Sequence, residues 1–340
     1  MKLVTFVGAG AVAPRIGALT DGDAVIDLTL AHASVLAALG RPSPSNAAAE
    51  ELPADMLALL QAGDLGLERA RAALAHAQAE GVDVVDGTRV RHAAGEIKLL
   101  APLPRPNSLR DYMVVEEHVR NCLPSIPPEW FNLPVYYKGN VGEIYGPEDV
   151  IPWPTYTDKL DYELEICAVI GRAGRHIAEE RAEEHIIGYT IYNDWSARDI
   201  QLREMSVGLG PSYSKDFASS IGPCIATVEE FDRDHAPLQA RVDGEFWSEG
   251  VLGKMHFSFE ELIAWTSREQ TLQPGDLLGS GTVGRGCGLE LDRWLTEGCI
   301  VELSAQGIGV LRNQVGRKGE GAMRAVSLAS TGFPEPRRTP

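Results

Sequence analysis

Two glutamates separated by a single residue, Glu163 and Glu165, could carry chemistry in this chain. They lie in residues 161–170, DYELEICAVI, whose apolar and β-branched side chains predict a strand. Side chains alternate between the faces of a strand, so both carboxylates share one face, with Cα atoms about 6–7 Å apart. Adjacent carboxylates repel each other, and Mg²⁺ and Ca²⁺ prefer carboxylate oxygen. The pair therefore predicts a divalent-cation site, although an isolated pair of this kind is also compatible with an ordinary solvated strand face.

A second predicted strand, residues 188–194, ends in another acid, Asp194. Loops begin where strands end, and the strand fixes the geometry of such an acid, so Asp194 could complete an oxygen ligand set with the two glutamates. Arg198 and Gln201 follow three residues apart and could share one helical face beside it. Lys215 stands in a loop rich in Gly, Pro and Ser, where it is either solvated or neutralises an enolate that develops near a metal.

A candidate base lies upstream of these acids. The sequence places Asp111 and His118 two helical turns apart, on one face if the segment is helical. A histidine titrates near neutrality and is a natural general base for activating water. Such a base needs an acid on its other ring nitrogen, and the candidates are the neighbouring Glu116 and Glu117 or the distant Glu290.

Composition narrows the class of protein. Of 340 residues, 44% are hydrophobic and 23% charged, which is typical of a folded globular chain. A net charge of −17 argues against nucleic acid or an anionic membrane as the partner. We see no apolar run long enough to span a bilayer. The five cysteines are widely spaced and lack a C-x-x-C pair, so we expect free thiols and a cytoplasmic protein.

The chain divides at a proline-rich connector, residues 101–106 (APLPRP). Before it, short strand patterns and a helix-forming stretch at 48–80 predict a small N-terminal domain, residues 1–103. After it, short strands and Gly/Pro-rich loops, including a hairpin turn at 242–245, predict a mainly β domain, residues 104–315. Residues 316–340 are polar and slightly basic and predict a mobile or loosely docked tail.

Several spaced segments resemble the fumarylacetoacetate hydrolase superfamily, over about residues 111–309. They are Asp111 with His118, YYKG at 136–139, DYELE at 161–165, NDWSARDIQ at 193–201, KDF at 215–217 and GLEL at 288–291. The layout is similar to the longer bacterial fumarylacetoacetase-like and acylpyruvase-like members. The resemblance implies an α+β fold, with a mixed β-roll catalytic domain and a small N-terminal α/β domain, in a homodimer.

The resemblance also implies roles for individual residues. The metal ligands would be Asp111, Glu163, Glu165 and Asp194. The cation would be Mg²⁺, with Mn²⁺ or Ca²⁺ as alternatives. His118 would be the base, Glu290 its orienting acid, and Lys215 a catalytic residue on the substrate oxygens. Substrate contacts are expected from Met113, Tyr137, Arg198, Gln201, Met205 and Thr282, the last on a glycine-rich active-site wall at 279–286.

The implied reaction is hydrolysis of a carbon–carbon bond in a 2,4-dioxo acid or related 1,3-diketone, in the catabolism of aromatic compounds or oxo acids. The same frame would support a hydratase, an isomerase or a decarboxylase acting on an oxo acid, and an inactive metal-stabilised scaffold is the rival from another class. Met113 and Met205 stand where fumarylacetoacetases carry tyrosines. The identity of the substrate is therefore open at this stage.

Overall fold

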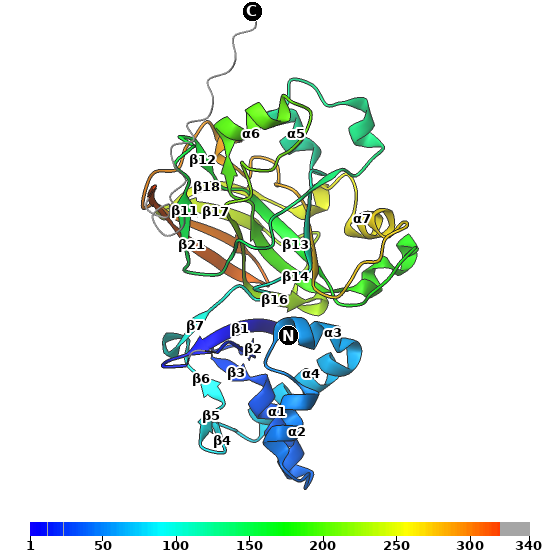
Figure 1. Cartoon of the computed structure of the whole chain (residues 1–340), viewed down its shortest axis with the longest axis vertical. Helices are drawn as coiled ribbons and strands as arrows, with labels where there is room; N and C mark the ends of the chain where they lie inside the picture. The colour runs from blue at the N-terminus through cyan, green and yellow to red at the C-terminus, as the bar shows by residue number, and fades with distance from the viewer. Residues whose placement is uncertain (12, 23, 320–340) are drawn as a thin grey trace, which may run out of the picture.

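The computed structural model describes residues 1–11, 13–22 and 24–319. Within these ranges, twelve strands form one mixed sheet and five strands form a second (Figure 1). The main path of the first sheet is β6 (Arg91–His92), β3 (Val25–Asp27), β2 (Arg15–Leu19), β1 (Lys2–Gly8), β16 (Ser219–Thr227), β14 (Ile186–Asn193), β13 (Leu164–Ile170), β19 (Asp276–Gly279), β8 (Ser108–Tyr112) and β9 (Tyr136–Lys138). The second sheet is β11 (Val150–Trp153), β21 (Gly309–Lys318), β20 (Ile300–Ala305), β17 (Leu238–Val242) and β18 (Glu245–Gly250).

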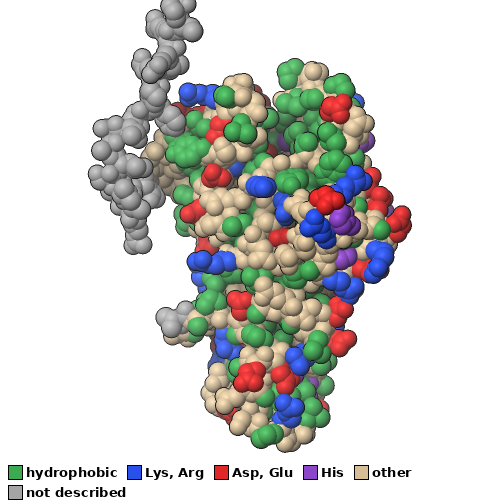
Figure 2. All heavy atoms as spheres, turned by 45° about the vertical axis from the view of Figure 1, so that its right-hand side comes forward, with side chains coloured by type: hydrophobic (Ala, Val, Ile, Leu, Met, Phe, Trp, Pro, Cys, Tyr) green, Lys and Arg blue, Asp and Glu red, His purple; other side chains and the backbone are tan. Residues whose placement is uncertain are grey.

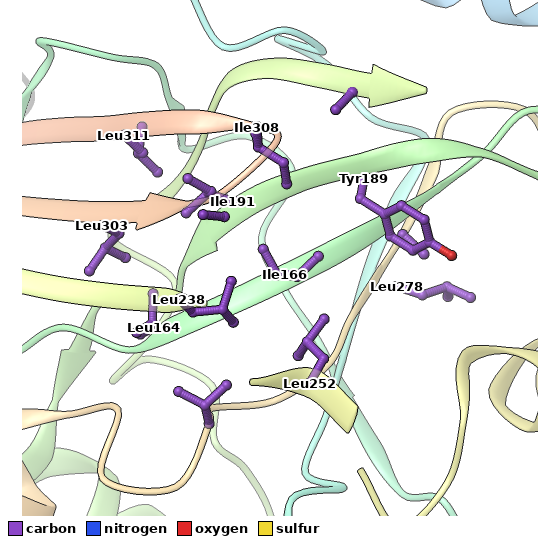
Figure 3. Packing of buried hydrophobic residues seen from close by; sticks show 14 of the residues in the cluster. Leu164, Ile166, Tyr189, Ile191, Leu238, Leu252, Leu278, Leu303, Ile308 and Leu311 are labelled. Atoms are coloured by element: carbon purple, nitrogen blue, oxygen red, sulfur yellow. The ribbon is translucent and has the colours of Figure 1, made fainter. Parts of the chain in front are cut away.

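The main hydrophobic core lies between the two sheets. Leu164 and Ile166 of β13 point into it, together with Leu238, Leu303 and Leu311 of the second sheet (Figure 3). Cys167 and Val169, which point to the other face of β13, belong to a separate core. The predicted alternation along this strand is therefore confirmed, and it follows that β13 is buried on both faces.

The opposite face of the large sheet packs against the N-terminal part of the chain. β1 pairs with β16 in antiparallel register, with Lys2 opposite Ala226. Leu59 and Leu60 join the core that contains Val169 and Ile225. The helices of this part are α1 (Leu28–Ala38), α2 (Pro44–Glu51), α3 (Met56–Gln61) and α4 (Gly63–Ala79). They lie in the lower part of Figure 1, beside β1, β2 and β3.

The remaining elements are short strands and helices outside the main paths of the two sheets. Two of the additional strands, β7 (Ile97–Leu99) and β10 (Ile144–Tyr145), join β1 and β16, and two short pairs are β4 (Val84–Val85) with β5 (Thr88–Arg89) and β12 (Leu160–Asp161) with β15 (Ser196–Ala197). The other α-helices are α5 (Glu116–Cys122), α6 (Arg198–Met205), α7 (Phe259–Thr266) and α8 (Gly288–Leu291). The hairpin expected at 242–245 joins β17 to β18, with positive φ at Asp243 and Gly244. None of the described helices is both long and apolar enough to cross a membrane.

The predicted α+β class with a mixed sheet is confirmed. The boundary at residue 103 stays a prediction, because the first strands continue the sheet of the second part rather than forming a sheet of their own. β21 runs to Lys318, three residues into the predicted tail. The rest of that tail, from residue 320, lies outside the described residues.

Gly188 tests the central pairing of the large sheet. A Cβ at this position of β14 would lie 2.1 Å from the carbonyl oxygen of Ala226 on β16. Because backbone cannot yield as a side-chain tip does, we expect Gly188→Ala to lower the free energy of unfolding by about 1–3 kcal/mol or more. Thermal and denaturant unfolding would measure this. Gly95→Ala, where an added Cβ meets nothing within 4 Å, is the matched control; equal stability of the two variants would contradict the argument.

Candidate active site

Three buried carboxylates converge on one edge of the large sheet. Asp111 lies on β8, Glu165 on β13, and Asp194 directly after β14. Strand pairing brings these residues together. Glu165 lies opposite Tyr192, two residues before Asp194. Asp111 lies opposite Gly279 of β19, the strand between β13 and β8. One carboxylate oxygen from each residue lies within 4.8 Å of the others. The tertiary structure therefore brings three of the four predicted ligands into one cluster.

The cluster has the electrostatics of a cation site. Burial and the charge of Asp194 raise the pKa of Asp111 well above its ordinary value, and burial and Asp111 do the same to Glu165. Asp111 Oδ1 and Glu165 Oε2 are buried and accept no hydrogen bond. A buried oxygen without a partner is costly, and a hard cation would satisfy both. The residues present therefore fit a divalent cation with oxygen ligands.

Glu163, the fourth predicted ligand, is held by two cationic side chains. Its Oε1 accepts a hydrogen bond of 2.7 Å from Arg198 Nη2, and its Oε2 accepts one from Lys215. Lys215 also donates to Asp194. Although burial opposes ionisation of Glu163, the charges of Arg198 and Lys215 outweigh it and lower its pKa. Lys215 thus connects Glu163 to the three-carboxylate cluster.

Asp161 is a buried acid for which the sequence motifs predicted no role. Its carboxylate accepts a hydrogen bond of 2.8 Å from Arg198 Nε and further hydrogen bonds from the backbone N–H groups of Gly288 and Leu289. It therefore braces both Arg198, which holds Glu163, and the short helix α8 that carries Glu290. The period-two spacing of Asp161, Glu163 and Glu165 was the signal that could have revealed it.

His118 and Glu290 form a buried hydrogen-bonded pair. Nδ1 of His118 lies 2.8 Å from Glu290 Oε2. Burial disfavours the charged ring, but hydrogen bonds with Cys287 and Glu290 outweigh this and raise the pKa of His118 to about 10. Of the three acids predicted as possible partners of His118, the partner is therefore Glu290, the most distant in sequence. Glu116 instead pairs with Arg120 on the outside of α5, and Glu117 reaches Lys254.

A pocket of about 410 Å³ opens between these groups. Eleven of the thirteen residues proposed from the sequence line it: Asp111, Met113, His118, Tyr137, Glu163, Glu165, Arg198, Gln201, Met205, Lys215 and Thr282. Asp194 and Glu290 lie behind this lining, where each bonds to a residue that does line it. The pocket therefore joins the carboxylate cluster to the His118–Glu290 pair.

Comparison with known proteins identifies the family of this site. The fumarylacetoacetate (FAA) hydrolase C-terminal family matches residues 109–316. The chain is 30% identical over 323 residues to oxaloacetate tautomerase fahd2, mitochondrial, of Xenopus laevis, across 93% of this chain and 90% of that protein. The chain belongs to the fumarylacetoacetate hydrolase family.

Solved structures of the family share this fold. Fumarylacetoacetate hydrolase from Exiguobacterium antarcticum superimposes with a TM-score of 0.68 at 25% identity, over 93% of this chain and 99% of its own. Maleylpyruvate hydrolase from Sphingobium, solved with manganese(II) and pyruvate, superimposes with a TM-score of 0.67 at 20% identity, over 93% and 99%. The proteins that this chain resembles thus include one named as a tautomerase and one named as a hydrolase.

Three of the residues predicted to contact substrate in this family member also support the carboxylates. The Tyr137 hydroxyl donates to Asp194 Oδ1 at 2.6 Å, and Thr282 Oγ1 donates to Glu165 Oε1 at 3.1 Å. Arg198 is turned toward Asp161 and Glu163, and its Nη1 donates to Gln201 Oε1. Their contacts with substrate stay predictions, but each already orients a residue of the site.

One expectation about local structure is wrong. Asp111 and His118 do not share a helical face, because Asp111 belongs to strand β8 and α5 begins only at Glu116. The pairing of β8 with β19 and β9 draws Asp111 into the large sheet. Spacing along the chain suggested a helix, whereas the sheet determines the backbone at Asp111.

The outer wall of the family member's pocket is apolar. Met113, Val135, Leu202 and Met205 contribute to it. Leu202 and Met205 are also exposed, at 61% and 41%. Figure 2 shows hydrophobic side chains gathered at the upper end of the molecule, where Figure 1 places α5 and α6. The pocket therefore has a charged inner end and an apolar mouth.

Proposed function

We propose that this protein is a divalent-cation-dependent tautomerase that interconverts the enol and keto forms of oxaloacetate or a closely related 2-oxo acid. The observation that carries the proposal is the His118–Glu290 pair, 2.8 Å apart, at a pocket that also contains the carboxylate cluster. The pair would supply a proton-transfer group beside a site for an oxo acid. Likeness to an oxaloacetate tautomerase along 93% of the chain favours that reaction within the family.

The carboxylates hold the charged end of the site. Asp111, Glu165 and Asp194 would bind the cation, with Glu163 beside them. A bound divalent cation supplies Lewis-acid polarisation of the substrate's oxygens. Lys215, fixed between Glu163 and Asp194, adds a positive charge where the substrate develops an enolate oxygen.

His118 is placed to move the proton. Because Glu290 holds Nδ1, the other ring nitrogen, Nε2, is the atom left for chemistry in the pocket. In the enol-to-keto direction Nε2 of the protonated ring delivers its proton to C3, and the substrate hydroxyl releases its proton to solvent, which reprotonates the ring. In the reverse direction neutral Nε2 removes the C3 proton, and the substrate oxygen takes a proton from solvent. Glu290 stabilises the charged ring in both directions.

Hydrolysis of a 2,4-dioxo acid is a second candidate, and the apolar mouth of the pocket favours it. Oxaloacetate is a small diacid, whereas Met113, Val135 and Met205 offer apolar surface to a longer acyl group. In that reaction His118 would first have to lose its proton, because its pKa is raised to about 10. The neutral ring would then deprotonate a water, and the leaving enolate would be stabilised by Lys215 and the bound cation. The two reactions share the enolate and differ in whether a carbon–carbon bond breaks.

A substrate panel with product identification tests both. We expect purified protein with Mg²⁺ or Mn²⁺ to accelerate the decay of the enol absorbance of oxaloacetate, giving the keto acid without carbon loss. Among the dioxo acids, we expect a higher kcat/KM for an acylpyruvate than for fumarylacetoacetate. The reason is that a distal carboxylate would face Met113 and Met205, which donate no hydrogen bond, while Arg120 is paired with Glu116 on the surface.

Two results would count against these assignments. Release of pyruvate from acylpyruvates with no effect on enol-oxaloacetate would replace the tautomerase by the hydrolase. A higher kcat/KM for fumarylacetoacetate than for a short acylpyruvate would show that the two methionines do not set specificity. The Lys215→Met variant, which removes the ammonium group while keeping the length of the side chain, serves as the low-activity reference for the panel.

A further inference from the structure

A second group of potential metal ligands lies beside the carboxylate cluster. His118 and Cys122 come from α5, Cys287 is the N-cap of α8, and Glu290 belongs to α8. One ligand atom from each lies within 4.8 Å of all the others. Among the residues that the structure describes, this is the one such group that contains sulfur. The group therefore differs in chemistry from the oxygen-only cluster.

Contacts within the group already approach those of a closed metal site. Cys122 Sγ lies 3.7 Å from His118 Nδ1, and Cys287 Sγ lies 3.3 Å from Glu290 Oε2. In a tetrahedral zinc site, metal–ligand bonds of about 2.0–2.3 Å place neighbouring ligand atoms about 3.3–3.8 Å apart. His118 Nδ1 and Glu290 Oε2, at 2.8 Å, need only separate by roughly 0.5 Å to match.

We propose that His118, Cys122, Cys287 and Glu290 form a site for Zn²⁺ or another soft divalent cation, and that occupancy of this site inhibits the enzyme. Two thiolates, an imidazole and a carboxylate form a donor set that suits zinc, whereas Mg²⁺ prefers oxygen alone. The two cations would therefore separate between the two clusters by ligand type.

The surroundings of Glu290 support metal binding through one oxygen. Its Oε1 accepts from the Arg285 backbone N–H at 2.8 Å and from Asn121 Nδ2 at 2.9 Å. These bonds fix the carboxylate and leave Oε2 directed at His118 and Cys287. Hydrogen bonds of this kind orient ligands in known metal sites and tune their affinity.

A cation can enter through the pocket. His118 and Cys122 both line it, and Cys122 is half-buried, whereas Cys287 lies behind. On binding, the two thiols would lose their protons to solvent, and the imidazole would keep a single proton on Nε2 because Nδ1 is bonded to the metal. A ring in this state cannot accept a proton at Nε2, and it gives up its single remaining proton far less readily than a doubly protonated ring does. The inhibitory part of the inference thus rests on the proposed role of His118, while the binding part does not.

Cobalt(II) is a direct probe of the binding part. The full chain, kept reduced and saturated with Mg²⁺, would be titrated with Co²⁺ while the near-ultraviolet absorbance is recorded. We expect a sulfur-to-cobalt charge-transfer band with one equivalent bound, which Zn²⁺ then displaces. Cobalt in the carboxylate cluster has no sulfur ligand and gives no such band.

Variants separate the site from other thiols. The band should disappear in Cys122→Ala and in Cys287→Ala, and should persist in Cys299→Ala, a buried free cysteine outside the group. If Cys287→Ala does not fold, the half-buried Cys122 still decides the question. Absence of the band in the parent protein, or its persistence in Cys122→Ala, would overturn the site.

Inhibition is measured separately, as the ratio of turnover with and without Zn²⁺ at saturating Mg²⁺. We expect the apparent inhibition constant to rise at least tenfold in Cys122→Ala relative to Cys299→Ala. A bound cobalt band without inhibition would retain the site and reject its regulatory role. A parent protein that shows the band but turns over none of the tested substrates would reject the proposed function and leave the site standing.

Discussion

Exhaustive removal of divalent cations is expected to abolish turnover, and Mg²⁺ or Mn²⁺ to restore it. The physical reason is the convergence of Asp111, Glu165 and Asp194 within 4.8 Å, with two buried oxygens that accept no hydrogen bond. Without a cation the buried charges repel each other. The loss is therefore expected to be close to complete rather than partial.

Thermal unfolding gives a readout of the same site that does not depend on activity. A cation at one hundred times its dissociation constant would stabilise the folded state by about 2.7 kcal/mol. Glu165→Gln should remove this stabilisation. In chelator-treated protein at neutral pH the same variant should be more stable than the parent, because it replaces a buried carboxylate that lies beside Asp111.

The variant should thus lose the stabilisation by the cation but gain stability in the absence of metal. These opposite effects distinguish a metal ligand from a merely structural glutamate. Glu68→Gln, on the exposed face of α4, is the matched control. It should change neither the stabilisation by the cation nor the stability of the chelator-treated protein. A Glu165→Gln variant that still gains the full melting-temperature increase with Mg²⁺ would exclude Glu165 as a ligand. Activity that survives exhaustive chelation would exclude a metal-dependent mechanism altogether.

Replacement of His118 by alanine is expected to lower turnover by about 10²–10⁴-fold while Mg²⁺ still raises the melting temperature. The ring is the group that we propose transfers a proton in the pocket, and it is not one of the clustered carboxylates. His235→Ala, at a position exposed on the surface, is the control and should keep full turnover. Turnover within a few-fold of the parent would remove His118 from the mechanism.

Glu290→Gln should produce a related loss through the ring rather than through the substrate. With Oε1 kept on the Arg285 and Asn121 donors, the new amide nitrogen would face His118 Nδ1 and donate to it. The ring proton would then move to Nε2, the nitrogen needed as acceptor. Because both residues act as one unit, the double variant should lose little more than His118→Ala alone. Fully additive losses would separate Glu290 from the base.

The sequence alone determined those features that depend on near neighbours. Alternation along residues 164–170 predicted which face carries Glu165, since strand geometry repeats every second residue. The Asp243–Gly244 turn predicted its hairpin, because both residues tolerate positive φ. The spaced motifs also indicated the family, which the comparisons confirm. They likewise identified eleven of the residues that line the pocket.

Only the tertiary structure decided which groups meet. Glu290 is 172 residues from His118, and no local rule selects it over the adjacent Glu116, which helix geometry turns outward. Strand pairing, rather than helical spacing, brought Asp111 to the cluster. Packing likewise turned Arg198 onto Asp161 and Glu163, and set Cys122 and Cys287 beside His118. These contacts join segments far apart in sequence, so they form only when β8, β13, β14, α5 and α8 pack around one core.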